Sequence, residues 1–169
     1  MRSPLNPPLM AAMICILQLG LSFAAEPSQA QTRKPTAREI ASIRDCVTRN
    51  KDDLDEGERR CLFNLVAEPC IGNPSAAADK AMEVDCYRIE DSIWDGLLND
   101  NYKGLLETLD DEQTAKARAM QHAWVAYRDT TCEFYHDKIQ GSMAITMHAA
   151  CVTRESARRA MLLMFFNRL

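Results

Sequence analysis

The side chains best suited to chemistry lie in one stretch, Gln-His-Ala-Trp-Val-Ala-Tyr-Arg-Asp-Thr-Thr-Cys, which covers residues 121–132. Spacings of three and four residues place four of them on one stripe of a helix. These four are Gln121, Trp124, Arg128 and Cys132. An arginine can lie along an indole ring and pair with a carboxylate of a facing helix, for which Glu90 and Asp95 are candidates. The pattern therefore favours a structural role for this stripe over a catalytic one.

The sequence offers few groups for acid, base or metal chemistry. Its three histidines are His122, His136 and His148. Glu133 and His136 form one Glu-x-x-His step, but a di-iron site in a helical bundle needs this motif twice and two further glutamates. A surface or packing role is therefore favoured for His136. Because the sequence also contains neither a Gly-x-Ser-x-Gly elbow nor a phosphate-binding glycine loop, we predict no catalytic residues, no metal, no cofactor and no enzymatic activity.

Acidic side chains gather in two parts of the chain. One group is Asp52, Asp53, Asp55, Glu56 and Glu58, and the other is Asp110, Asp111 and Glu112. The simplest interpretation is solvation together with favourable charge at helix N-termini, worth a few tenths to about 1 kcal/mol each. The alternative is that these loops steer a basic protein partner, which would make association faster and salt-dependent.

The first thirty residues have the pattern of a secretory signal peptide. One cation precedes an apolar run of 15 residues, 9–23, which is shorter than the roughly 20 residues of a membrane-spanning helix. Small residues follow it, so we predict a signal peptide over residues 1–30, with cleavage after Ala24 or Ala30. An uncleaved membrane anchor is disfavoured because no stop-transfer pattern follows. We expect a periplasmic or secreted protein without a membrane span.

Removal of residues 1–30 leaves 139 residues (169 − 30), which is enough for one domain with a real core. Arg2 and Glu26 are lost together, so the mature chain has 19 basic (20 − 1) and 23 acidic (24 − 1) residues, a net charge of −4. Nothing in this charge balance attracts nucleic acid.

Six cysteines remain once Cys15 is removed, and an even count in an exported chain indicates disulfides. Without any Cys-x-x-Cys pair, zinc binding by these residues is disfavoured. Several pairings remain open from the sequence alone. The pairs favoured by proximity are Cys132 with Cys151, across a glycine-containing turn, Cys46 with Cys61, and Cys70 with Cys86.

The apolar periods predict helices, and no alternating strand pattern occurs. Thr36 and Glu39 form a capping box that starts the first helix. A polar connection over residues 51–56 and a second short apolar face over residues 61–66 follow. The predicted fold is an all-α, disulfide-stapled antiparallel helical bundle. Its predicted parts are a signal peptide over residues 1–30, a flexible lead-in over 31–35, a helical hairpin extension over 36–74 and a main helical domain over 75–169, the last two forming one compact unit.

The main domain is predicted to hold three longer helices. Ser75 is the expected N-cap of the longest, which runs to about Leu109. Asp110 and Gln113 form a second capping box, and the last helix begins near Ala144. After this second capping box, apolar side chains recur at alternating steps of three and four, the period of an antiparallel helix pair. They are Ala117, Met120, Trp124, Tyr127, Thr131 and Phe134.

Several residues of the main domain form a recognisable signature. Its specific part is the Gln-x-x-Trp-x-x-Tyr-Arg-Asp-x-x-Cys run, and Asn99 and Tyr102 support it. The signature residues are Asn99, Tyr102, Gln121, Trp124, Tyr127 and Arg128, and the further matching residues are Cys86, Trp94, Leu98, Leu105, Asp129, Cys132, Gly141, Ser142, Cys151, Ser156 and Arg159. Over about residues 80–165, this order resembles the LprI-type lysozyme inhibitor family of exported bacterial proteins. The chain departs from the family in its turn, reduced to Gly141-Ser142, and in lacking a lipid-anchor cysteine.

The resemblance implies a helical, disulfide-bonded envelope protein and, for some members, inhibition of lysozyme. An inhibitor of this kind would occlude the glycan cleft of lysozyme without chemistry of its own, and a net charge of −4 suits an enzyme that is usually basic. Candidate contact loops are residues 51–58 and 138–143. Their candidate partner-binding residues are Asp52, Asp53, Asp55, Glu56, Gly141 and Ser142. The alternative is a periplasmic structural or stress-related module that binds another protein without inhibiting lysozyme.

Overall fold

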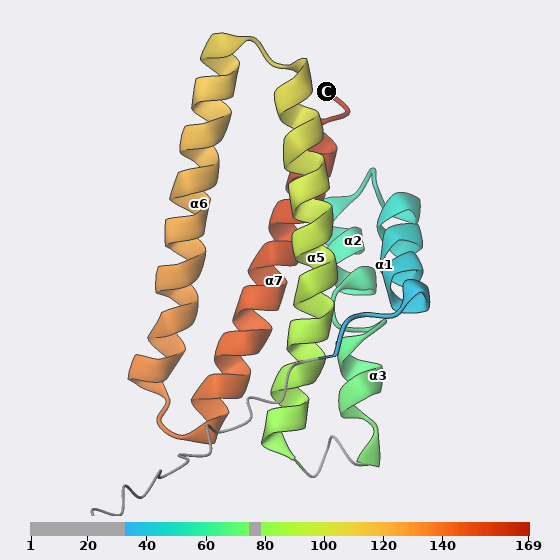
Figure 1. The fold of residues 1–169 in the computed structure, drawn as a ribbon, viewed down its shortest axis with the longest axis vertical. Helices are drawn as coiled ribbons and strands as arrows, with labels where there is room; N and C mark the ends of the chain where they lie inside the picture. The colour runs from blue at the N-terminus through green and yellow to red at the C-terminus, as the bar shows by residue number, and fades with distance from the viewer. Residues whose placement is uncertain (1–32, 75–78) are drawn as a thin grey trace, which may run out of the picture. The chain divides into compact units, whose positions relative to one another are not determined.

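The computed structural model describes residues 33–74 and 79–169, which belong to one compact unit (Figure 1). The predicted signal peptide and Ser75 lie outside the described residues. The described helices are α1 (Ala37–Arg49), α2 (Leu54–Cys61), α3 (Ala67–Ile71), α5 (Lys80–Thr108), α6 (Asp111–Lys138) and α7 (Ser142–Phe166). The described ranges contain no strand, and three disulfides join the helices, so the predicted all-α fold with disulfide staples is confirmed.

Three long helices, α5, α6 and α7, form the main body, and α7 packs against both of the others (Figure 1). Thirteen of the 25 residues of α7 are buried, whereas only two of the 28 residues of α6 are. Five of the buried residues of α7 are alanines, and such small side chains allow neighbouring elements to approach closely. Helix α7 is therefore the central element, and α6 is a lateral helix with most of its surface in solvent.

The two predicted capping boxes form as expected. Thr36 Oγ1 accepts a hydrogen bond from the backbone N–H of Glu39, and the carboxylate of Glu39 accepts one from the N–H of Thr36. Asp110 and Gln113 cap α6 in the same reciprocal way. Arg33 also donates to the Glu39 carboxylate, and this interaction lowers the pKa of Glu39 to about 2. Local signals of this kind set helix starts reliably because both partners lie within one turn.

Two predicted boundaries are wrong. Helix α5 begins at Lys80, later than expected, because Asp79 is its N-cap and accepts a hydrogen bond from the N–H of Ala81. Helix α2 begins inside the predicted polar connection because Asp53 caps it. The apolar face predicted over residues 61–66 does pack in the core, although most of it is a turn that follows the end of α2 at Cys61.

The short N-terminal helices share one core with the long helices. A carboxylate in the middle of α5 connects the two parts. Glu90 is fully buried, and its oxygens accept hydrogen bonds from the N–H of Phe63 (2.7 Å), the N–H of Ala67 (2.8 Å) and Nε1 of Trp94 (3.0 Å). Burial raises the pKa of Glu90. Phe63 takes a left-handed φ of 67°, so the chain turns sharply where it approaches this carboxylate.

The disulfides are Cys46–Cys61, Cys70–Cys86 and Cys132–Cys151, the same pairs that proximity in the sequence favoured. They join α1 to α2, α3 to α5 and α6 to α7, respectively. Each therefore fixes a helix that has few buried residues to a neighbour.

Candidate functional site

The stripe of α6 that contains Gln121, Trp124 and Arg128 faces α7. Two arginines, one from each helix, lie near the indole ring of Trp124. The guanidinium groups of Arg128 and Arg159 lie 5.0 and 5.6 Å from the centroid of Trp124, within range of a cation–π interaction. Nε of Arg159 donates to Oε1 of Gln121 over 2.9 Å. Arg159 is only 5% exposed, and burial lowers its pKa. Gln121 and Trp124 therefore hold an arginine of the central helix in the interface between α6 and α7.

The predicted carboxylate partners of Arg128 are wrong. Arg128 pairs with Asp129, its neighbour in the chain, over 2.7 Å. Glu90 binds the backbone of the N-terminal extension, and Asp95 accepts a hydrogen bond from Asn99. The carboxylate of α5 that Arg128 affects is instead Asp91, whose pKa burial raises and the charge of Arg128 partly lowers.

The remaining signature residues divide between core and surface. Tyr102 is half-buried and packs against the core, whereas Asn99 is exposed and binds only within its own helix. On α5, Asp91 is hydrogen-bonded to Ser156 of α7, and burial raises the pKa of Asp91. Most of this signature therefore describes how the long helices pack.

The second half of the predicted apolar stripe of α6 is not buried. Ala117, Met120 and Trp124 are buried or half-buried as expected, but the side chains of Tyr127 and Phe134 are 53% and 60% exposed. Periodicity identifies residues that share a face, and none of the described elements covers the C-terminal part of that face. The predicted packing of α6 against a neighbouring helix therefore buries the first half of the stripe but not the second.

Large apolar side chains are exposed on both sides of the turn between α6 and α7. We define the hairpin tip as Phe134, Met143 and Ile145, of which Met143 is 63% and Ile145 is 48% exposed. The turn between them contains Gly141, whose φ of 84° favours glycine, and Ser142, where α7 begins. Sequence reasoning proposed this turn as a contact loop, but it placed Phe134 on a packing stripe and did not single out Met143 or Ile145.

Two of the four carboxylates in the acidic connection at residues 52–56 are paired with cations. Asp52 interacts with Lys51 and Arg168, whose hydrogen bonds lower its pKa. Arg59 and Arg60 bind Glu56 and lower its pKa in the same way. Asp53 caps α2, whereas Asp55 is exposed. The charges of Asp52 and Glu56 are therefore compensated within the molecule.

A cavity of about 630 Å³ lies beside α3 and α5, around the Cys70–Cys86 disulfide. Its wall is mainly apolar, and the described residues that line it include no histidine or serine and no free cysteine. Its two carboxylates, Glu39 and Asp85, are paired with Arg33 and Arg88.

These features define an all-α protein stapled by three disulfides, with an interhelical polar cluster and an exposed apolar hairpin tip. The family model described as Lysozyme inhibitor LprI matches residues 70–163, which is more than half of the chain, and the protein belongs to this family. The comparisons with curated proteins and with solved structures each returned no match. None of the described helices combines the length and apolar character that crossing a membrane would need.

Proposed function

We propose that the protein is exported through the signal peptide at residues 1–30 and inhibits lysozyme by binding to it. Membership of the lysozyme inhibitor family is the observation that carries this proposal. Lysozyme cleaves its glycan with two carboxylates in a cleft, so a protein that fills the cleft keeps the substrate away from them. This action requires no catalytic group in the inhibitor.

We propose the hairpin tip as the contact surface. Its apolar side chains are about half exposed, so each would gain roughly half of the about 1.5–3 kcal/mol that burial of a fully exposed side chain provides. The tip ends a helical hairpin whose two helices are joined by Cys132–Cys151, within one turn of Phe134. A surface held in this way loses little conformational entropy on binding.

Charge supports a basic partner and favours the tip over the acidic connection. The net charge of −4 would attract a basic lysozyme and raise the association rate. Two of the four carboxylates of the connection at residues 52–56, Asp52 and Glu56, are paired with lysine and arginine, and displacing these cations would cost part of the binding energy. The apolar side chains of the hairpin tip form no ion pairs that binding would have to break.

The test is clearing of a cell-wall suspension by lysozyme in the presence of the purified protein. We expect clearing to slow in proportion to the protein added. Phe134→Ser and Met143→Ser should each raise the inhibition constant about tenfold, as expected for anchor residues of an interface. Met82→Ser is the matched control, because Met82 is a similarly exposed apolar residue on α5, outside the tip.

Two outcomes would change the proposal. Unslowed clearing at a large molar excess, with both c-type and g-type lysozymes, would rule out inhibition and favour a module that binds another envelope protein. Inhibition that survives both tip replacements but is lost in Asp55→Lys would move the contact surface to the acidic connection.

A further inference from the structure

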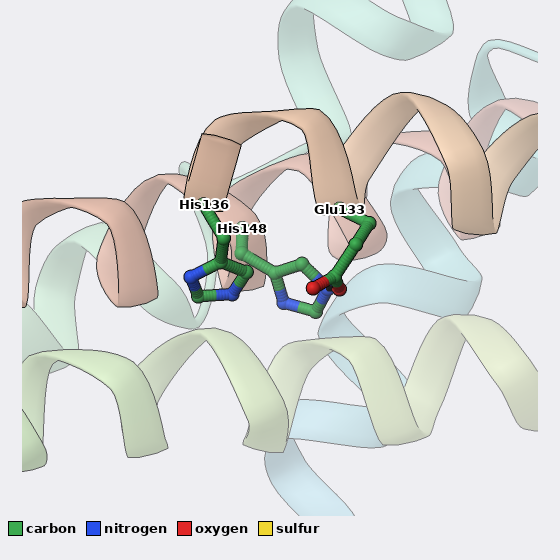
Figure 2. Close-up of side chains that lie close together, drawn as sticks. All are labelled: Glu133, His136 and His148. Atoms are coloured by element: carbon green, nitrogen blue, oxygen red, sulfur yellow. Dashed lines mark ion pairs between the residues drawn. The ribbon is translucent and has the colours of Figure 1, made fainter. Parts of the chain in front are cut away.

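Two histidines and a glutamate come together where α6 and α7 approach the turn between them (Figure 2). Glu133 and His136 belong to α6, and His148 belongs to α7. One ligand atom from each of the three side chains lies within 4.8 Å of the other two. The imidazole rings of His136 and His148 are 4.9 Å apart at their centroids, and Oε2 of Glu133 lies 3.7 Å from Nε2 of His148.

The Cys132–Cys151 disulfide fixes the backbone that carries this cluster. Cys132 directly precedes Glu133 and is one turn before His136, and Cys151 is one turn after His148. The two cysteine Cα atoms are 5.5 Å apart. The disulfide therefore fixes the separation of the two helices and their alignment along the helix axes at this point. Only rotation of the three side chains is needed to bring their ligand atoms together.

We propose that Glu133, His136 and His148 form a binding site for a borderline divalent cation such as Zn²⁺. Two imidazoles and one carboxylate are ligands that Zn²⁺ accepts, and two nitrogen donors disfavour Ca²⁺ and Mg²⁺. Ligand atoms around a tetrahedral Zn²⁺ lie about 3.4 Å apart, given bonds of about 2.1 Å. Glu133 and His136 are exposed, so rotation of their side chains closes the remaining gap.

The surroundings of His148 suit a bound cation. His148 lines a cavity of about 220 Å³ between α5 and α7, which Asp91 also lines. Oδ1 of Asp91 is buried and has no hydrogen-bond partner among the described residues. The cation that lines the same cavity, Arg88, pairs with Asp85. Asp91 itself is hydrogen-bonded to Ser156 and interacts with the charge of Arg128, so the proposed site rests on Glu133, His136 and His148 and not on Asp91. Three protein ligands leave a fourth position for water or a group of a partner.

The test is calorimetric titration of the purified, untagged and oxidised protein with ZnCl₂. We expect one Zn²⁺ per chain. His136→Gln and His148→Gln should each weaken binding by more than about tenfold, because losing a direct ligand should cost at least as much as losing an outer partner. His122→Gln is the matched control, since His122 is an exposed histidine of the same helix outside the cluster.

Thermal unfolding by circular dichroism checks that each variant is folded. Because His136 is exposed, its replacement keeps the test valid even if the half-buried His148 proves necessary for folding. Absence of one-to-one Zn²⁺ binding, unchanged binding in folded His136→Gln, or loss of binding in His122→Gln would overturn the proposal. Since the titration uses the metal alone, its result is independent of lysozyme inhibition.

Discussion

At the scale of single residues, Arg159 shows how the family signature acts. It lies in the central helix, yet the side chains that hold it, Gln121 and Trp124, come from the lateral helix α6. Its Nη2 is buried and has no hydrogen-bond partner among the described residues. The guanidinium therefore depends on the indole face and one amide oxygen for compensation. A tryptophan and an arginine in a motif need not indicate a binding face, because here they join two helices.

Replacing Arg159 should loosen the attachment of α6. We expect Arg159→Ala to lower the free energy of unfolding by about 2 kcal/mol, because it removes the contact with Trp124 and leaves the half-buried amide of Gln121 without its donor. Urea unfolding measures this change. Arg158→Ala is the matched control: Arg158 forms only exposed or part-buried ion pairs, with Glu58 and Glu155, and its loss should cost less than about 1 kcal/mol. Equal effects of the two replacements would contradict this account.

At the scale of elements, the sequence predicted what is local and missed what depends on distant parts of the chain. The capping boxes at Thr36 and Asp110 were identified because both partners lie within four residues. The three hydrogen bonds accepted by Glu90 were not, because two of their donors are backbone groups more than twenty residues away. Likewise, periodicity placed Tyr127 on the apolar stripe but could not show that its side chain is about half exposed among the described residues.

The candidate sites were predicted only in part for the same reason, because they too depend on contacts between distant parts of the chain. The turn at Gly141 and Ser142 was proposed from its residue types, but the sequence could not show that the apolar residues beside it stay exposed, and periodicity even placed Phe134 on a packing face. The histidine cluster was missed because His148 lies beyond that turn, in the next helix. Only the packing of α6 on α7 brings such residues together.

The limited burial of α6 makes its disulfide important. In Cys132→Ser/Cys151→Ser, we expect α6 to detach locally beyond Trp124, since Cys132 is the only buried residue in that half of the helix. A disulfide that closes a loop of this length contributes about 3 kcal/mol in the chain-entropy model. Amide hydrogen exchange should therefore speed up by about tenfold or more in residues 125–138 and stay slow in residues 89–98 of α5.

The control for this experiment is Cys46→Ser/Cys61→Ser, which removes the bond between α1 and α2. We expect it to leave exchange in α6 unchanged. Slow exchange throughout α6 in Cys132→Ser/Cys151→Ser would show that packing on α7 is sufficient without the disulfide.

At the scale of the whole molecule, the family match and the core have different boundaries. The match begins at residue 70, whereas the core includes apolar residues well before it. These residues are Ile43, Cys46, Val47, Cys61, Leu62 and Val66, and they cluster with residues of α5 and α7. The N-terminal extension is therefore part of the same folding unit, although the family signature does not require it.

A chain that begins at residue 79 should consequently fail to fold. It would expose Ile89, Ile93 and Trp94 to water and leave Glu90 without two backbone donors. Each buried aliphatic residue lost from the extension contributes about 1.5–3 kcal/mol, so their sum is comparable to the 5–15 kcal/mol of a typical small domain. Because truncation removes Cys70, the truncated chain should carry Cys86→Ser. The control is the chain from residue 33 with Cys70→Ser/Cys86→Ser, which lacks the same disulfide but keeps the extension. We expect cooperative urea unfolding from the control and none from the truncated chain, and a cooperative transition in the latter would show that the family segment folds without its extension.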